Sequence, residues 1–297
     1  YFIFCYYNGV TFSYVHSCVI TGRHIPAAVK PLGNRAMAEF DSWAAYYDYL
    51  HPGLPGEAEF YGGQALRRGG PVLEAGCGTG RLAILMAMSG LKVTGVDNSA
   101  AMLAVCREKA SHAGVKKKNL VLVEADMRHV NLGAAYPLAI MAYRTFMHCL
   151  TVEDQLNCLR CIYNHLVPGG EFFCNLWAAQ PARIARYRTR PDFNRRTLAD
   201  TVYIPSEDIM LIHFVSLWRD DARQLLHERH WVREQGRNGN TLHEEELSMT
   251  RAWTTPREME HLAARTGFTT IAVLGDFDGT PWTPKHTEMI WHFRRPG

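Results

Sequence analysis

Residues 72–80 constrain the fold of this chain more than any other segment. A short apolar stretch, Val-Leu-Glu-Ala, runs into the glycine-rich sequence Gly76-Cys-Gly-Thr-Gly, and residues 81–89 that follow have helical spacing. Glycine permits backbone conformations that other residues avoid, so a ligand can lie against the bare backbone with the helix N-terminus facing it. A dinucleotide-binding G-x-G-x-x-G fingerprint would have its third glycine at position 81, which is Arg81. We therefore predict a strand, a ligand-binding turn and a helix.

The same alternation of strand and helix recurs along the chain. Further apolar strands are expected at residues 92–96, 120–123, 138–142, 171–177, 269–274 and 288–294. Helices are expected between them, and Ser99, Thr151 and Thr255 are suitable cap residues at three helix starts. Repeated βα units of this length favour a parallel sheet with helices on both faces, so the predicted fold class is α/β.

A different pattern follows the fifth predicted strand. Three extended stretches with a period of two, at 210–218, 224–234 and 241–253, are joined by turn-forming residues. We predict that they form an inserted antiparallel meander. The expected domains are a helical N-terminal lid at 37–70 with helices at 40–50 and 57–68, a ligand-binding domain at 71–178 and 255–297, and a substrate-side cap at 179–254.

Residues 1–36 differ in composition from the rest of the chain. They include no Asp or Glu, although the whole chain has 29, and they are rich in aromatic residues. They lack the basic start of a signal peptide and the unbroken apolar run of about 18 residues that a membrane-spanning helix needs. We expect an extension outside the working domain, such as an upstream read-through. A genuine N-terminal arm is the alternative.

The overall composition is that of a globular protein, with 297 residues, 47% hydrophobic and 21% charged. The net charge of +3 is too small to indicate a nucleic-acid partner. Eight irregularly spaced cysteines favour buried thiols in a reducing compartment over a disulfide scaffold. We therefore expect a cytoplasmic protein, a monomer or a homodimer, that binds neither nucleic acid nor a membrane.

Two carboxylates follow the second and third predicted strands. Asp97 ends the second strand, where a carboxylate can accept hydrogen bonds from both hydroxyls of a ribose. Asp126 follows the third strand at the same edge of the sheet and can accept an adenine amino group. Together with the glycine loop, these residues indicate a nucleoside-containing ligand far more specifically than any one feature does.

The motifs LEAGCGTGR, GVDNSAAML, EADM and HLVPGGEF resemble those of the class I S-adenosylmethionine-dependent methyltransferases. The resemblance covers about residues 37–296. It is closest to bacterial small-molecule enzymes with a Tyr-Asp pair in an N-terminal helix, here Tyr47-Asp48, and the meander is similar to that of sugar-amine N-methyltransferases. It implies a Rossmann-like, mostly parallel seven-stranded sheet with an antiparallel last strand, S-adenosyl-L-methionine as cofactor and a small-molecule acceptor. The Asn/Asp-Pro-Pro-Tyr signature of nucleic-acid amino methylation is absent.

The resemblance also implies roles for individual residues. The loop glycines would let the methionine and ribose portions pass, and Glu74 would anchor the loop or bind the amino group through water. Asp97 would hold the ribose hydroxyls, and Asp126 would take the adenine amino group. The implied cofactor-binding residues are Glu74, Gly76, Cys77, Gly78, Gly80, Asp97, Asn98, Met102, Asp126, Met127 and Tyr143.

Methyl transfer to an N, O or S nucleophile requires the reactants to be held close in a dry pocket. It needs a general base only if the acceptor is protonated. The predicted catalytic residues are His148, Tyr47 and Arg144. The first two are candidate bases, with Tyr61 a more remote one, and Arg144 can hold a carboxylate. The simpler alternative for His148 is a core histidine.

Other polar clusters have simpler interpretations. Cys158 and Cys161 lie inside a predicted helix without a second cysteine pair, so we expect core packing and no metal site. The arginine-rich segment 183–196 is more typical of a solvated segment paired with the acidic residues 243–246 than of an anion site. His213, His227 and His230 are expected at mixed surface and packing positions. Two other functions stay open: a nicotinamide-dependent oxidoreductase, which Arg81 and Asp126 disfavour, and a protein that binds the cofactor without catalysis.

Overall fold

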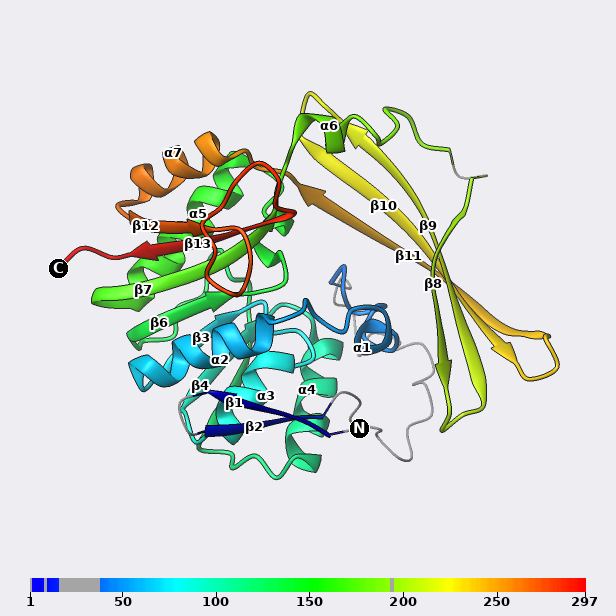
Figure 1. Cartoon of the computed structure of the whole chain (residues 1–297), viewed down its shortest axis with the longest axis horizontal. Coiled ribbons are helices and arrows are strands. Elements are labelled where there is room, and N and C mark those ends of the chain that lie inside the picture. The colour runs from blue at the N-terminus through cyan, green and yellow to red at the C-terminus, as the bar shows by residue number, and fades with distance from the viewer. Residues whose placement is uncertain (1, 8–9, 16–37, 193–194) are drawn as a thin grey trace.

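The computed structural model describes residues 2–7, 10–15, 38–192 and 195–297. Its largest element is a seven-stranded sheet with the order β12-β13-β7-β6-β3-β4-β5 (Figure 1). The strands are β3 (Val72–Ala75), β4 (Val93–Asp97), β5 (Leu120–Glu124), β6 (Tyr136–Met141), β7 (Leu166–Trp177), β12 (Thr269–Leu274) and β13 (Glu288–Arg294). Neighbours among β3 to β7 are parallel, and β13 runs antiparallel to both β7 and β12. The predicted Rossmann-like α/β fold with an antiparallel last strand is confirmed.

Helices cover both faces of this sheet. One face packs against α5 (Val152–His165) and α7 (Pro256–Thr266), and the other against α2 (Glu57–Arg68), α3 (Arg81–Met88) and α4 (Ala100–His112). The three predicted caps form, because the side chains of Ser99, Thr151 and Thr255 accept backbone N–H groups at the starts of α4, α5 and α7. The helix predicted over 57–68 is confirmed as α2.

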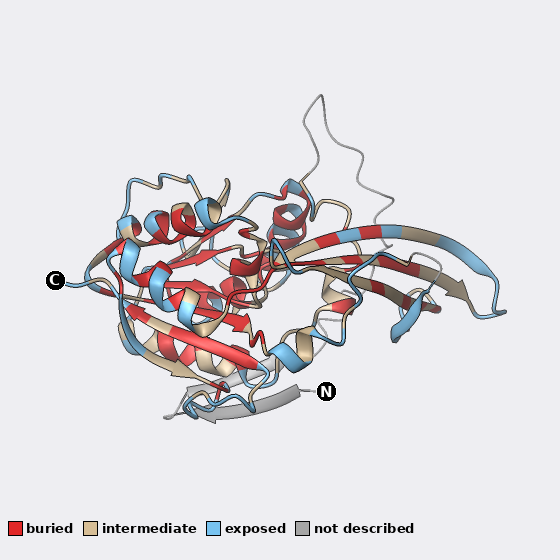
Figure 2. Cartoon of the chain, turned by 90° about the horizontal axis from the view of Figure 1, so that it is seen from above, coloured by how far each residue is buried: buried red, intermediate tan, exposed pale blue. Residues whose placement is uncertain are grey.

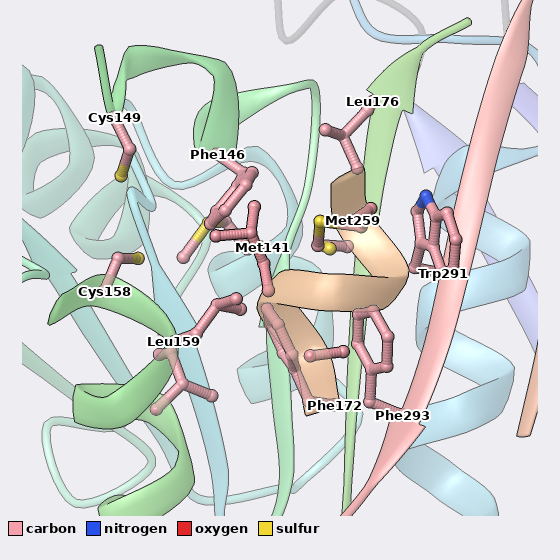
Figure 3. Close-up of a cluster of buried hydrophobic side chains, with 14 of the residues drawn as sticks. Met141, Phe146, Cys149, Cys158, Leu159, Phe172, Leu176, Met259, Trp291 and Phe293 are labelled. Carbon is pink, nitrogen blue, oxygen red and sulfur yellow. The ribbon is translucent and has the colours of Figure 1, made fainter. Parts of the chain in front are cut away.

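The larger core lies between the sheet and the helices α5 and α7. In Figure 3, Phe146 of the short 3₁₀ helix η1 (Thr145–His148) packs beside Met141, the last residue of β6. Cys149 and Cys158 join the same cluster as buried free thiols, as expected for packing residues. The segment after β6 is thus partly helical, and the buried Phe146 fixes it against the core.

A second, antiparallel sheet has the order β11-β10-β9-β8, with β8 (Thr197–Ile204), β9 (Ile209–Asp220), β10 (Leu225–Gly236) and β11 (Thr241–Ala252). The predicted meander is confirmed as β9 to β11, and Figure 2 shows buried residues alternating with intermediate ones along part of this sheet. Strand β8 was not predicted. A register shift between Leu198 and Asp200 interrupts its alternation, and nearly all of its side chains are exposed.

The N-terminal segment packs between the two sheets near α1 (Tyr47–Leu50) (Figure 1). The helix predicted over 40–50 is wrong for its first part, since only α1 is an α-helix. Trp43 donates its Nε1–H to the carbonyl of Ser248, and Tyr46 donates its hydroxyl to Glu234. These contacts with the antiparallel sheet shape residues 40–46 into turns. A further short helix, α6 (Pro181–Ile184), follows β7.

Most of the predicted extension 1–36 lies outside the described residues. Within it, β1 (Phe2–Tyr7) and β2 (Val10–Val15) pair as an antiparallel hairpin. Across the part of the chain that the structure describes, no helix combines the length and the apolar character needed to cross a membrane.

Candidate active site

The glycine loop between β3 and α3 contains three residues with positive φ. They are Gly76 (70°), Gly78 (53°) and Gly80 (81°). A Cβ at Gly76 would stand 2.2 Å from Cγ2 of Thr145, and a Cβ at Gly80 would stand 2.2 Å from Sγ of Cys106. At Gly78, no described heavy atom outside its chain neighbours lies within 4 Å of that position. Two of the glycines are therefore required by packing, and Gly78 alone faces open space.

Asp97 lies at the end of β4, directly beside this loop. Its carboxylate accepts hydrogen bonds from the backbone N–H of Gly78 (2.8 Å) and of Ser99 (2.9 Å). Burial raises the pKa of Asp97, and these two N–H groups oppose that rise. Asn98, the next residue, is exposed. The carboxylate thus ties the loop to the start of α4 at the edge where a ribose was expected.

Residues 41–48 form hydrogen bonds with the same loop and with the start of α4. Asp48 of α1 accepts hydrogen bonds from the hydroxyl of Thr79 (2.5 Å) and from Nζ of Lys109 on α4 (2.7 Å). Asp41 accepts a hydrogen bond from the hydroxyl of Ser99 (2.6 Å). The Tyr47-Asp48 pair noted in the sequence therefore places its aspartate on the loop.

Glu74 is buried under the loop at the end of β3. Burial raises its pKa to about 8. Its Oε2 atom is buried and has no hydrogen-bond partner among the described residues. A buried acceptor without a partner is costly, and a ligand group that donates a hydrogen bond would satisfy it.

Asp126 stands two residues beyond the end of β5, next to Asp97 in space, since the N–H of Ala125 donates to the carbonyl of Asp97 (3.0 Å). Its carboxylate is bound by the guanidinium of Arg128. Met127 packs partly buried against the core. The remaining predicted cofactor residues, Cys77 and Met102, are buried in hydrophobic clusters.

A strained corner follows β6. Tyr143 (φ 51°) and Arg144 (φ 66°) both adopt the left-handed conformation, which costs about 1–3 kcal/mol per non-glycine residue. Buried side chains hold the corner: Glu57 accepts from the N–H of Tyr143 (3.1 Å) and Asn175 from that of Arg144 (3.4 Å). The guanidinium of Arg144 also forms an ion pair with the buried Glu288. Sequence reasoning missed Glu57, Asn175 and Glu288, because nothing local marks them as partners of this corner.

An arc of five half-buried aromatic rings lines the edge beyond the loop. Successive ring centroids are 4.9 Å apart for His148 and Phe40, 6.2 Å for Phe40 and Tyr47, 4.9 Å for Tyr47 and His51, and 5.9 Å for His51 and Tyr143. Burial lowers the pKa of His148 to about 4 and that of His51 to about 3, so both imidazoles are neutral at pH 7. Burial also raises the pKa of Tyr47.

The predicted catalytic residues are thus brought together only in part. His148 and Tyr47 share the aromatic arc through Phe40, and Arg144 stands at the corner that adjoins the arc through Tyr143. Tyr61 is fully buried, and its hydroxyl lies 3.4 Å from Asn175 behind the corner. Tyr61 therefore supports the corner and does not line the arc.

These features fit S-adenosylmethionine. The open position above Gly78 leaves room for a ligand at the loop. The unpartnered oxygen of Glu74 can accept a hydrogen bond from such a ligand. Asp97 and Asp126 follow one another along the edge at which the ribose and the base would lie. The aromatic arc reaches Tyr143, just past the end of β6.

Comparison with known proteins agrees with this fit. Residues 72–170, from β3 into β7, match the sequence model of a family described as methyltransferase domain. A cypemycin N-terminal methyltransferase from Streptomyces sp is 27% identical over 230 residues, which are 75% of this chain and 82% of that protein. The chain is an S-adenosylmethionine-dependent methyltransferase.

Solved structures share the fold of this methyltransferase. The CcbJ methyltransferase from Streptomyces caelestis superposes with a TM-score of 0.66 at 25% identity, covering 82% of this chain and 97% of that one. The amino pentose methyltransferase CalS10 from Micromonospora echinaspora, solved with S-adenosylmethionine bound, has a TM-score of 0.61 at 19% identity. That match covers 83% of this chain and 94% of CalS10. The cofactor of the present methyltransferase is S-adenosyl-L-methionine.

Proposed function

We propose that this methyltransferase transfers the methyl group to an amino nitrogen of a small molecule or short peptide. The observation that carries the proposal is the apolar setting of the candidate base: the ring of His148 packs on Phe40, and its Nδ1 atom is buried without a hydrogen-bond partner among the described residues. Burial lowers the pKa of His148 to about 4. A base this weak removes almost no proton from a hydroxyl group. The acceptor must therefore be nucleophilic without first losing a proton to a base of the enzyme.

An amine meets this requirement at the lowest free-energy cost. An α-amino group with a pKa of about 8 is half neutral at pH 8, whereas a phenol with a pKa of about 10 is only about 1% ionised. An aliphatic hydroxyl is less acidic still. The cypemycin enzyme, named for methylation of an N-terminus, is consistent with this choice.

The chain's own residues then have separate tasks. We propose that Asp97 holds the ribose hydroxyls, that Asp126 accepts from the adenine amino group and that Glu74 accepts from a donor of the methionine portion. The bound cofactor supplies an electrophilic methyl group on its sulfonium. The arc of Phe40, Tyr47 and His148 excludes water and offers ring faces to an amine, including its protonated form on arrival. Arg144, neutralised by Glu288, shapes the corner.

We propose that the domains predicted from the sequence bind the two substrates separately. Residues 71–178 and 255–297 would bind the cofactor, and the segments 37–70 and 179–254 would enclose the acceptor. We also propose a cytoplasmic enzyme that acts on free small molecules and not on nucleic acid, as a monomer or a homodimer.

The test uses matched acceptors that differ in one group. Short peptides or amino compounds, their N-acetylated forms and their hydroxyl analogues are incubated with S-adenosylmethionine, and a mass increase of one methyl group is measured. We expect methylation of the free amines alone, with a rate that rises with pH around the pKa of each amine. Faster methylation of the hydroxyl analogues would contradict the proposal, and the Asp97→Ala variant serves as the inactive control.

A further inference from the structure

The carboxylate of Asp126 is fixed by a network that the sequence did not reveal. Nε of Arg128 lies 2.9 and 3.0 Å from the two oxygens of Asp126, and Nη2 lies 2.6 Å from Oδ2. The backbone N–H of Arg128 also donates to Oδ1 (2.9 Å). Asp126 therefore cannot rotate without breaking several charge-assisted hydrogen bonds.

The same guanidinium reaches a second carboxylate. Its Nη1 forms an ion pair with Asp154 in the first turn of α5. The other oxygen of Asp154 accepts from the hydroxyl of Thr151 (2.9 Å), the N-cap of α5. The chain Thr151–Asp154–Arg128–Asp126 thus anchors the carboxylate after β5 to the start of a helix that is packed on the core.

Arg128 also fixes the charge of Asp126. Its hydrogen bonds to the carboxylate lower the pKa of Asp126. An ionised carboxylate only accepts hydrogen bonds. About a third of the Asp126 side chain (32%) remains exposed, so a further donor from a ligand can reach it.

We propose that Arg128 is a positioning residue that makes the nucleoside site select a 6-amino purine over a 6-oxo purine. Adenine presents an N–H donor at position 6, whereas hypoxanthine presents a carbonyl oxygen that a fixed, ionised carboxylate repels. Arg128 acts through Asp126, and the inference rests on the adenine-binding role given to Asp126 in the proposed function. Asp154 serves in turn as the anchor of Arg128.

The experiment compares two ligands that differ only at position 6. The dissociation constants of S-adenosylhomocysteine and S-inosylhomocysteine are measured by calorimetry for the wild-type chain, Arg128→Met, Arg128→Gln and Asp126→Asn. A matched control is Arg160→Met, because Arg160 is exposed further along α5. We expect the wild type and the control to favour the adenine ligand by about tenfold or more, which is a 1.4 kcal/mol difference.

Both Arg128 variants should lower this preference at least about fivefold, while melting curves show folded protein. Asp126→Asn should lower it further, because the amide can donate to the 6-oxo group. If Arg128→Met and Arg128→Gln weaken both ligands equally while Asp126→Asn abolishes the preference, the role of Arg128 is refuted and that of Asp126 stands. If Asp126→Asn keeps the wild-type preference, the adenine role of Asp126 fails, and the inference about Arg128 fails with it.

Discussion

Alanine substitutions at Gly76 and Gly78 separate the packing role of the glycine loop from its ligand-binding role. At Gly76, with φ of 70°, a Cβ would stand 2.2 Å from Cγ2 and 3.2 Å from Cβ of Thr145. The left-handed conformation costs an alanine about 1–2 kcal/mol, and overpacking adds about 1–3 kcal/mol. We expect Gly76→Ala to lower the free energy of unfolding by about 2–5 kcal/mol. Gly78→Ala has no overlap with the described residues and should lose only about 1–2 kcal/mol.

The binding of S-adenosylhomocysteine should be weakened more by Gly78→Ala than by Gly76→Ala. The new methyl group in Gly78→Ala occupies the open space above the loop, so we expect at least a tenfold weaker dissociation constant in a well-folded protein. Melting temperatures, which change by roughly 2–4 °C per kcal/mol in a protein of this size, and calorimetric titrations provide the two readouts.

A second substitution tests the cause of the Gly76 effect. Thr145→Ser removes Cγ2 but keeps the hydroxyl that donates to the carbonyl of Ala142 (2.8 Å). In the Gly76→Ala background it should recover part of the lost stability. Equal melting temperatures for the Gly76 and Gly78 variants, or normal cofactor binding by Gly78→Ala, would refute this division of roles.

Two further predictions concern the corner and the aromatic arc. Arg144→Met leaves the buried Glu288 carboxylate without its cation, so urea unfolding should show a free energy of unfolding lower by about 3–5 kcal/mol. The Arg144→Met/Glu288→Met double variant should largely recover this stability, and equal losses in both variants would contradict the ion-pair argument. Burial lowers the pKa of His148 from its ordinary value of 6.5 to about 4 in the folded protein. Between pH 4 and 6.5 the unfolded chain therefore binds more protons than the folded one, and the melting temperature should fall as pH drops through this range. That fall should be smaller in His148→Phe, and this variant should keep kcat within about threefold at pH 8, whereas a hundredfold loss would show that His148 is a general base.

Local patterns predicted the cofactor half of the molecule well. Strand, glycine turn and helix follow one another within a few residues in β3–α3 and β4–α4, so hydrophobic periodicity and cap residues locate them. Asp97 could be placed beside the loop because parallel strands end at one edge. The same logic placed Asp126, but it could not find Arg128 as the residue that fixes the carboxylate.

The side-chain partners of the corner could not be predicted, because contacts between residues far apart in the sequence decide them. Glu57, Asn175 and Glu288 are far apart in sequence and meet only where α2, β7 and β13 converge on the corner. Residues 40–46 have helical spacing, yet their large side chains bind the antiparallel sheet and give turns. Burial, which no local pattern measures, lowers the pKa of His148 to about 4 and so makes its imidazole a weaker base.

The most direct measurement of the central claim is calorimetric titration of the wild-type chain and of Asp97→Ala with S-adenosylmethionine, S-adenosylhomocysteine and NAD. The carboxylate of Asp97 both fixes the loop through the N–H of Gly78 and faces the expected ribose. We predict binding of both sulfur nucleosides to the wild type and none of NAD. Asp97→Ala should weaken this binding at least tenfold, a loss of about 1.4 kcal/mol. Binding of NAD without S-adenosylmethionine, or unchanged affinity in Asp97→Ala, would contradict the account.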